Sequence, residues 1–324
     1  MKRPVAALVA GAVALSGACA SSGDATTDDA GYPENLSTLT MVVPFSAGGT
    51  TDSVARVLAP LLEEELDAAV QILNLPERDG QAGFERLADA APDGSLIGFT
   101  NVPSAAATYI GSEASYDRDS FVPLGAVTSL STVVGVHADS DFRDFRDLVD
   151  AALAAPGEVT LAAGALDDRI QVHQIEQTTG AVFNKIPFEG GASGEITALL
   201  GKKVDAILTA PVAMVPNVES GDFRVVAIFG PDRIDALPDA PTSGEQGVDL
   251  EMLSRIGLSA PAGTGDEVTG VLTDALRRVA ELPEFQEQMS ALGYEGGFVE
   301  PDRLAADWTD AEEVTRTVIE EEGR

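Results

Sequence analysis

The sequence has very little of the residues on which most enzyme active sites and metal sites depend. Its 324 residues include a single cysteine, Cys19, and two histidines, His137 and His173. One cysteine allows no intramolecular disulfide, and the sequence holds no cluster of cysteines and histidines of the kind that binds zinc. Neither the G-x-S-x-G sequence of a serine hydrolase nor the G-K-[ST] ending of a P-loop occurs. The sequence therefore predicts a protein that is not an enzyme and has no cofactor or metal.

Basic residues are scarce as well. Lysine and arginine number 20 against 53 aspartates and glutamates, and the formal net charge is −33. Nucleic acids and anionic lipid surfaces are bound through clustered basic side chains, so this balance argues against both kinds of partner. A hydrophobic fraction of 44% is typical of a globular chain with a substantial core. An anionic ligand would have to be held by local backbone dipoles, because the overall field opposes it.

The amino terminus resembles an export signal. Lys2 and Arg3 precede an apolar run over 4–18 that is too short to span a bilayer. The run ends in Leu-Ser-Gly-Ala-Cys, which resembles a lipobox in which Cys19 becomes the lipid-modified first residue. The alternative is cleavage after Ala-Cys-Ala at 18–20, which removes the cysteine. We expect a signal peptide with a lipobox at 1–19, a flexible tether at 20–35, and an exported protein anchored by lipid to the extracytoplasmic face of the cell membrane, periplasmic or at the cell surface.

The rest of the chain has the pattern of an α/β protein with mostly parallel sheets, because strand-like apolar runs alternate with helix-like runs. A strand over 39–43 leads into a helix over 52–66, and the alternation starts again near residue 131. The C-terminal helices follow one strand over 256–260 and should pack back on the first lobe. We predict two doubly wound α/β lobes with a hinge and an interlobe cleft, divided into 36–130 with 255–324 as lobe 1 and 131–254 as lobe 2.

One segment carries a family resemblance. Residues 43–56 read Val-Pro-Phe-Ser-Ala-Gly-Gly-Thr-Thr-Asp-Ser-Val-Ala-Arg, which is similar to the signature of the tripartite tricarboxylate transporter substrate-binding proteins, the TctC/Bug family. Further matches follow in the family's order at 91–94, 186–191, 237–242 and 260–264, so that the resemblance covers residues 36–324. It implies a class II periplasmic binding protein fold that captures a small organic carboxylate of the di- or tricarboxylate class. It also implies delivery to a transporter with a large and a small membrane subunit.

The physics of this segment points the same way. A strand that ends in Gly48-Gly49 and opens a helix presents unpaired backbone N–H groups at the positive end of the helix dipole, which can hold an anion without a cation. The glycines could instead serve only the geometry of a tight turn. Asp52 could cap the helix or contact a polar group of the ligand. The candidate ligand-binding residues of this loop are Phe45, Ser46, Ala47, Gly48, Gly49, Thr50, Thr51 and Asp52.

In the second lobe the family resemblance places the ligand loop at 162–173, where this chain lacks the family's Ser/Gly/Thr-rich pattern. Arg169 or Gln171 could replace the missing donors, since arginine binds carboxylates with paired N–H groups. Alternatively, Asp167 or Asp168 neutralises Arg169 on the surface. Arg255 stands where relatives often have an aromatic residue and is a candidate second carboxylate clamp. The remaining candidates, chosen by position, are Asn101, Ser104, Gly164, His173 and Thr209.

Two functions would use this pocket. The first is transport, in which the lobes close on a carboxylate and the permease recognises the closed form. The second is sensing, in which the liganded protein binds a two-component sensor kinase. An enzyme of unknown chemistry is opposed by the missing catalytic residues. We expect a monomer, and the sequence leaves open whether the ligand is citrate-like, a shorter dicarboxylate, an aromatic acid or an amino acid.

Overall fold

The computed structural model describes residues 31–78, 80–112, 114–164, 166–188, 191–295 and 297–322. Cys19, the predicted signal peptide and most of the predicted tether lie outside these residues. Residues 31–35, which we expected to belong to the tether, instead form a turn in which the Asn35 N–H donates to the Gly31 carbonyl. The Tyr32 hydroxyl donates to the Gly94 carbonyl, and its ring packs on the core. This turn therefore belongs to the folded body.

Lobe 1 is built on a five-stranded sheet with the order β2-β1-β3-β10-β4. Its parallel strands are β1 (Thr38–Val43), β2 (Ala69–Asn74) and β3 (Leu96–Phe99), while β10 (Leu253–Pro261) runs antiparallel to both β3 and β4 (Phe121–Ser131). The helices are α1 (Thr50–Leu66), α2 (Gln81–Ala88), α3 (Ser104–Ile110), α8 (Asp266–Ala280), α9 (Pro283–Ala291) and α10 (Pro301–Glu322), with a 3₁₀ helix at Arg118–Ser120.

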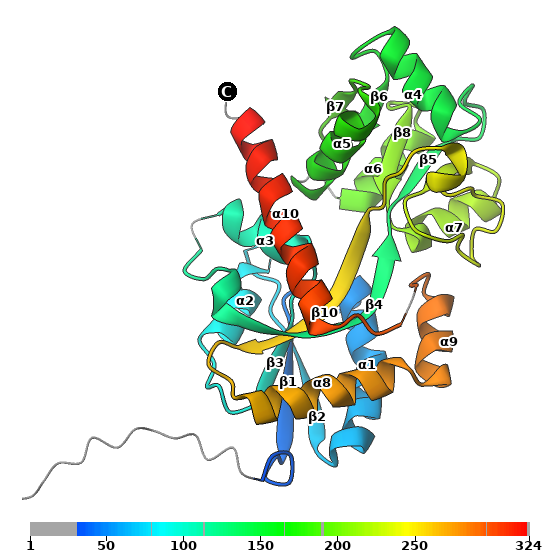
Figure 1. Ribbon diagram of the computed structural model, residues 1–324. Helices are drawn as coiled ribbons and strands as arrows, with labels where there is room; N and C mark the ends of the chain where they lie inside the picture. Colours follow the sequence, from blue (N-terminus) through cyan, green and yellow to red (C-terminus); the bar gives the residue numbers. More distant parts are fainter. Residues whose placement is uncertain are drawn as a thin grey trace, which may run out of the picture.

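Lobe 2 is built on a second five-stranded sheet with the order β7-β6-β8-β5-β9. Strands β6 (Thr160–Ala162), β7 (Asn184–Ile186) and β8 (Ala206–Thr209) are parallel, and β5 (Val133–His137) is antiparallel to β8 and β9 (Phe223–Ile228). The helices are α4 (Phe145–Ala154), α5 (Leu166–Thr179), α6 (Gly191–Leu200) and α7 (Pro211–Glu219), with a 3₁₀ helix at Gly244–Gln246. Figure 1 shows this lobe above lobe 1.

Each lobe forms because its apolar residues repeat with the period of its elements. In α1, the buried side chains of Val54, Leu58, Leu62 and Leu66 make one stripe that packs on the sheet of lobe 1. Lobe 2 has a core of its own between α4 and the sheet, in which the rings of Phe145 and Phe229 pack edge-to-face among other buried side chains. The prediction of two wound α/β lobes is confirmed, but both sheets are mixed rather than mostly parallel.

The two lobes are joined by an antiparallel ribbon. Strand β4 pairs with β10 along its length, from Phe121 opposite Pro261 to Ser131 opposite Leu253. Beyond it, the Thr132 N–H donates to the Met252 carbonyl, so the pairing continues toward lobe 2. The two segments in which the chain passes between the lobes thus lie side by side and form the hinge. The predicted lobe borders, at 130/131 and 254/255, fall in this ribbon and stay a prediction.

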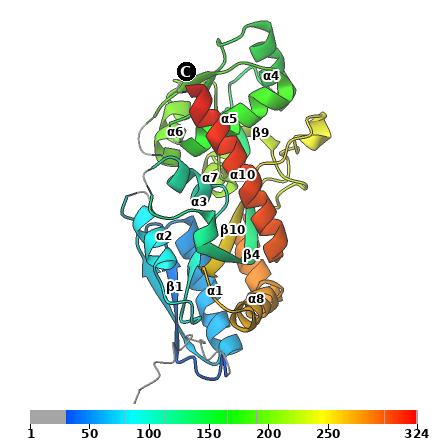
Figure 2. The same cartoon turned by 60° about the vertical axis from the view of Figure 1, so that its left-hand side comes forward.

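Helix α10 lies along both lobes, as Figures 1 and 2 show from two sides. Near its start, Leu304 and Trp308 are fully buried in lobe 1. Near its end, Val318 packs with Ala107 of α3 and Ile170 of α5. The helix therefore connects the lobes at a place other than the hinge. Within the described parts of the chain, no helix is both long and apolar enough to cross a membrane.

Candidate functional site

The loops that follow β1 and β3 meet at one edge of lobe 1. These strands are parallel and adjacent, so their carboxyl ends lie side by side, which is where open α/β sheets bind ligands. The loop after β3 leads into α3, whose first residue, Ser104, donates a hydrogen bond to Asp167 of lobe 2 over 3.1 Å. This edge of lobe 1 therefore faces the second lobe.

The loop between β1 and α1 is held by a buried carboxylate. Asp52 is fully buried and accepts hydrogen bonds from the Gly48 N–H at 2.7 Å and from the Arg56 guanidinium at 2.7 and 3.1 Å. Asn74 donates to the same carboxylate at 3.0 Å and to the Phe45 carbonyl at 3.2 Å. Burial raises the pKa of Asp52, but the bonds from Arg56, Gly48 and Asn74 outweigh it and lower the pKa. Asp52 thus positions the loop with both of its oxygens engaged.

These bonds determine which backbone N–H groups of the loop remain able to bind a ligand. The Gly48 N–H is taken by Asp52, and the Gly49 N–H donates to the Ser46 carbonyl. The first backbone bond that α1 makes is from Ser53 to the Gly49 carbonyl. The N–H groups left without helical partners are therefore those of residues 50–52. Gly48 itself has φ +80°, a conformation that favours glycine.

Two neighbours flank the start of α1. The Asn101 amide nitrogen donates to the Thr51 hydroxyl at 2.8 Å, and both side chains are buried. The Tyr294 hydroxyl lies beside the Thr50 side chain. Asn101 Oδ1 is buried and has no hydrogen-bond partner within the described residues. The structure thus brings together Thr50, Thr51 and Asn101, which the sequence pointed to separately.

Lobe 2 presents carboxyl groups to this region rather than hydroxyl donors. Helix α5 begins at Leu166, so Asp167 and Asp168 lie in its first turn. Asp167 Oδ2 accepts from Ser104, and Asp167 Oδ1 is buried with no partner among the residues described. Burial raises the pKa of Asp167, the Ser104 bond opposes the shift, and the charge of Asp168 adds to it.

Asp168, in the same helical turn, is paired with another carboxyl group. Glu195 of α6 is only 3% exposed and is hydrogen-bonded to Asp168. Burial, then the charge of Asp168, raises the pKa of Glu195 to about 8. A hydrogen bond between two carboxyl groups needs a proton, so the pair shares one at neutral pH. Sequence reasoning missed Glu195, because the residue pattern says nothing of a partner on another helix.

The other candidates near α5 have structural contacts. Arg169 donates to the Gly164 carbonyl at 3.2 Å. A side chain at Gly164 would place its Cβ 2.4 Å from the Phe188 carbonyl oxygen, so only glycine fits there. His173 lies 3.3 Å from Glu321 of α10. Thr209 ends β8 and is half-buried. None of these contacts reaches the start of α1.

The tip of the β1–α1 loop is open to solvent. Ser46, Ala47 and Gly48 are exposed. Phe45 packs edge-to-face on Phe84 of α2, with ring centroids 6.4 Å apart. The Phe45 ring therefore anchors the loop to lobe 1.

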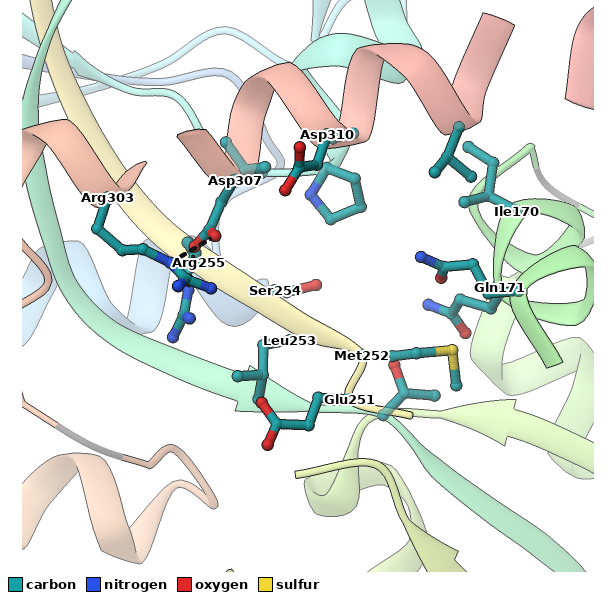
Figure 3. Close-up of a pocket in the computed structure, with 16 residues that line it drawn as sticks. Ile170, Gln171, Glu251, Met252, Leu253, Ser254, Arg255, Arg303, Asp307 and Asp310 are labelled. Carbon is teal, nitrogen blue, oxygen red and sulfur yellow. Dashed lines mark hydrogen bonds and ion pairs between the residues drawn. The ribbon is translucent and has the colours of Figure 1, made fainter. Parts of the chain in front are cut away.

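Gln171 and Arg255 lie in a separate cavity of about 240 Å³ between α5, α10 and the start of β10 (Figure 3). No residue of the β1–α1 loop lines it. The Arg255 guanidinium donates to Asp307 and to the Ser129 hydroxyl, both at 2.8 Å, and Asp307 also pairs with Arg303 at 2.7 Å. In Figure 3, Gln171 faces Asp310 and Asp307 across the cavity. The structure thus separates these two candidates from the start of α1.

A family model for the tripartite tricarboxylate transporter family receptor, TctC, matches residues 54–323. The chain belongs to this family. Among curated proteins, it is 27% identical over 320 residues to the "UPF0065 protein in gbd 5'region" of Cupriavidus necator, covering 97% of this chain and 95% of that protein. It is 29% identical to Protein BugT of Bordetella pertussis, covering 81% and 82%.

Solved structures share the fold of this TctC receptor. A TctC solute-binding protein from Polaromonas superposes with a TM-score of 0.76 at 21% identity, over 90% of this chain and 99% of that one. MatC from Rhodopseudomonas palustris, solved with bound malate, gives 0.67 at 23%, over 86% and 99%. Another R. palustris protein, solved with adipate, gives 0.68 at 22%, over 89% and 98%. The family resemblance and the two-lobed periplasmic binding protein fold are confirmed, and the chain is an extracytoplasmic solute receptor.

Proposed function

We propose that this receptor captures a small organic carboxylate between its lobes and delivers it to a tripartite tricarboxylate-type membrane transporter. The observation that carries the proposal is the unfilled hydrogen-bonding capacity where the lobes face each other. The helix geometry leaves the amides of residues 50–52 without partners, and Asn101 Oδ1 and Asp167 Oδ1 are buried and unpaired within the described residues. Buried polar groups are nearly always paired, so a solute or its bridging waters would complete these bonds.

The start of α1 suits a carboxylate. Its N–H groups and the positive end of the helix dipole favour an anion without a cationic side chain, which fits a chain of net charge −33. The malate and the adipate in two proteins of the same fold are both carboxylates, which supports this ligand class. We place the ligand-binding residues at 45–52, Asn101 and Ser104, with Asp167 opposite them.

The test is a thermal-shift screen of carboxylates, followed by calorimetric titration of those that stabilise. A ligand at a hundred times its dissociation constant should add about 2.7 kcal/mol of stability. Gly49→Val should abolish this shift, because its Cβ would lie 3.1 Å from the Ser46 carbonyl oxygen, beside the start of α1. Gly270→Val is the matched control, since a Cβ at Gly270 meets nothing within 4 Å. If Gly49→Val binds as well as the control, the start of α1 is not the site.

The anchor and the partner are further parts of the proposal. We propose that the chain is exported as a monomer and held at the extracytoplasmic face of the membrane by a lipid on Cys19. Metabolic labelling with a palmitate analogue should mark the wild type but not Cys19→Ala, and an unlabelled wild type would refute the anchor. Pull-down with and without the carboxylate should recover the transporter's membrane subunits from the liganded sample. Recovery of a sensor kinase instead would favour the sensing role.

A further inference from the structure

The basic side chains on α1, α5 and β10 are already engaged. Arg56 is paired with Asp52, Arg169 donates to the Gly164 carbonyl, and Arg255 is paired with Asp307. His173 faces Glu321 of α10. A dicarboxylate whose first carboxylate sits at the start of α1 would therefore bring its second one to a region without a free cation, as far as the described residues show.

Two of the buried groups that lack partners there are hydrogen-bond acceptors. Asn101 is 6% exposed, and its Oδ1 has no partner while its amide nitrogen is bonded to Thr51. Asp167 Oδ1 is also buried without a partner in the described part of the chain. An acceptor left unpaired in a buried site is costly, and each of these two calls for an N–H or O–H donor.

These two acceptors lie close to the start of α1. Asn101 stands on the side of Thr51, to which it is bonded. Asp167 reaches the same region from lobe 2, because its other oxygen accepts from Ser104, three residues after Asn101. A solute at this helix end would therefore have N–H donors on one side and acceptors from both lobes on the other.

Asp167 also lies close to negative charge. Burial raises the pKa of Asp167, because its charged form is disfavoured until a positive partner arrives. Asp168 and Glu195 add their shared charge behind Asp167. An ammonium group has three N–H donors and a positive charge, so it matches both the geometry and the field.

We propose that the solute carries an ammonium group as well as its carboxylate, so that the receptor selects an amino-carboxylate zwitterion over a carboxylate of the same length without nitrogen. This inference rests on the proposed function. The carboxylate binds the amides at the start of α1, and the ammonium binds Asn101 Oδ1 and Asp167 Oδ1. Asp167 is then the residue that determines specificity, because it closes on the ammonium from the opposite lobe.

The experiment uses pairs of probes that differ only in the amino group: alanine against propionate, aspartate against succinate, and glutamate against glutarate. Calorimetric titration of the purified protein should show the amino member of the best pair binding at least about tenfold more tightly, because its analogue leaves buried acceptors unpaired. Equal or tighter binding of the analogue would overturn the inference and leave the proposed function standing. If no amino member binds while another carboxylate of the thermal-shift screen does, the inference is overturned and the proposed function stands; if no carboxylate binds, both fail.

The matched variants are Asp167→Asn and Asp310→Asn. Asp167→Asn keeps the size of the side chain and should reduce the preference for the amino member about tenfold. Asp310→Asn removes one charge from the cavity beside α10 and should leave the preference unchanged. A preference that survives in Asp167→Asn would overturn the role of this residue. Native mass spectrometry of any co-purified solute gives an independent readout: it should react with an amine reagent, and a bound carboxylate that does not react contradicts the inference.

Discussion

The Gly48 N–H donates a 2.7 Å hydrogen bond to the buried carboxylate of Asp52, four residues later in the chain. Through this bond the Gly48-Gly49 turn of the β1–α1 loop is tied to the first turn of the helix that follows it. The same carboxylate holds Arg56 and Asn74, and Asn74 reaches back to the Phe45 carbonyl. The start of α1, where we propose that the carboxylate binds, is thus held by these bonds without a ligand, which would lower the entropy lost on binding.

Asp52→Asn should weaken both the fold and ligand binding. The amide keeps the size of the side chain but loses the charge that pairs with Arg56, and its nitrogen cannot accept the Gly48 N–H or the Asn74 amide. We expect a loss of about 1–3 kcal/mol in the free energy of unfolding, measured by urea denaturation, and a weaker carboxylate affinity by calorimetry. Glu85→Gln on α2, which breaks the exposed pair with Arg78, is the control and should change neither. Wild-type affinity in Asp52→Asn would contradict the positioning role.

The Asp52 network also predicts a response to acid. Because the pKa of Asp52 is lowered in the folded protein, the stability it contributes is present above the pKa of the unfolded chain and is lost as the pH falls through the folded value. The difference in unfolding free energy between wild type and Asp52→Asn should therefore shrink below about pH 4. A difference that stays constant down to pH 2 would show that the charge of Asp52 is not what stabilises the loop.

Ser104→Ala should destabilise the contact between the lobes. It removes the donor to Asp167 Oδ2, and both oxygens of a carboxylate at the lobe interface then lack this protein partner. The expected cost is about 1–3 kcal/mol, seen as a lower Tm. Ser112→Ala is the control: this exposed serine, just past the end of α3, bonds only to the Thr108 carbonyl. Equal Tm values for the two variants would show that the Ser104 bond contributes nothing.

Glu195→Gln should be more stable than the wild type, and the difference should be largest at high pH. The pKa of Glu195 is about 8 when folded, against an ordinary value of 4.5, so the folded chain holds a proton that the unfolded chain releases. Stability from this group is therefore fully present below pH 4.5 and is lost as the pH rises through 8. Glutamine donates to Asp168 at every pH, so the Tm advantage of the variant should grow between pH 5 and 8 by about 2–4 °C for each kcal/mol involved.

The control for this pH series is Glu219→Gln, an exposed glutamate at the end of α7. Its Tm should run parallel to that of the wild type across the range. If the curve of Glu195→Gln is parallel as well, the proton shared between α5 and α6 has no part in stability.

Local patterns were sufficient to predict most of the fold. The spacing of Val54, Leu58, Leu62 and Leu66 predicts α1. Strand β4 is one of the elements that the pattern does not predict. Pro123 and Gly125 interrupt it and are typical of a loop, but pairing with β10 on the far side of the sequence makes it a strand.

The candidate site was less predictable, because its charges depend on distant partners. Arg255 alone suggests a carboxylate clamp, and only the fold brings Asp307 to its side. Asp167, Glu195 and Glu295 were not among the candidate residues, because nothing in their own segments shows that other elements bury these side chains. The signal that could have found Asp167 is the departure of 162–173 from the family pattern, where acidic residues stand in place of hydroxyl donors.

The ribbon of β4 and β10 also restricts how the receptor can move. Its two strands pair along their length, with register shifts at Ile256/Gly257 and Leu258/Ser259, so a sliding displacement of one along the other would break many bonds at once, whereas a bend across the flat face of the ribbon would keep them. Lobe 2 can therefore tilt toward lobe 1 but cannot shear past it. Each closure of the lobes would then bring Asp167 to the same position opposite Asn101, and a solute of the wrong length would prevent complete closure.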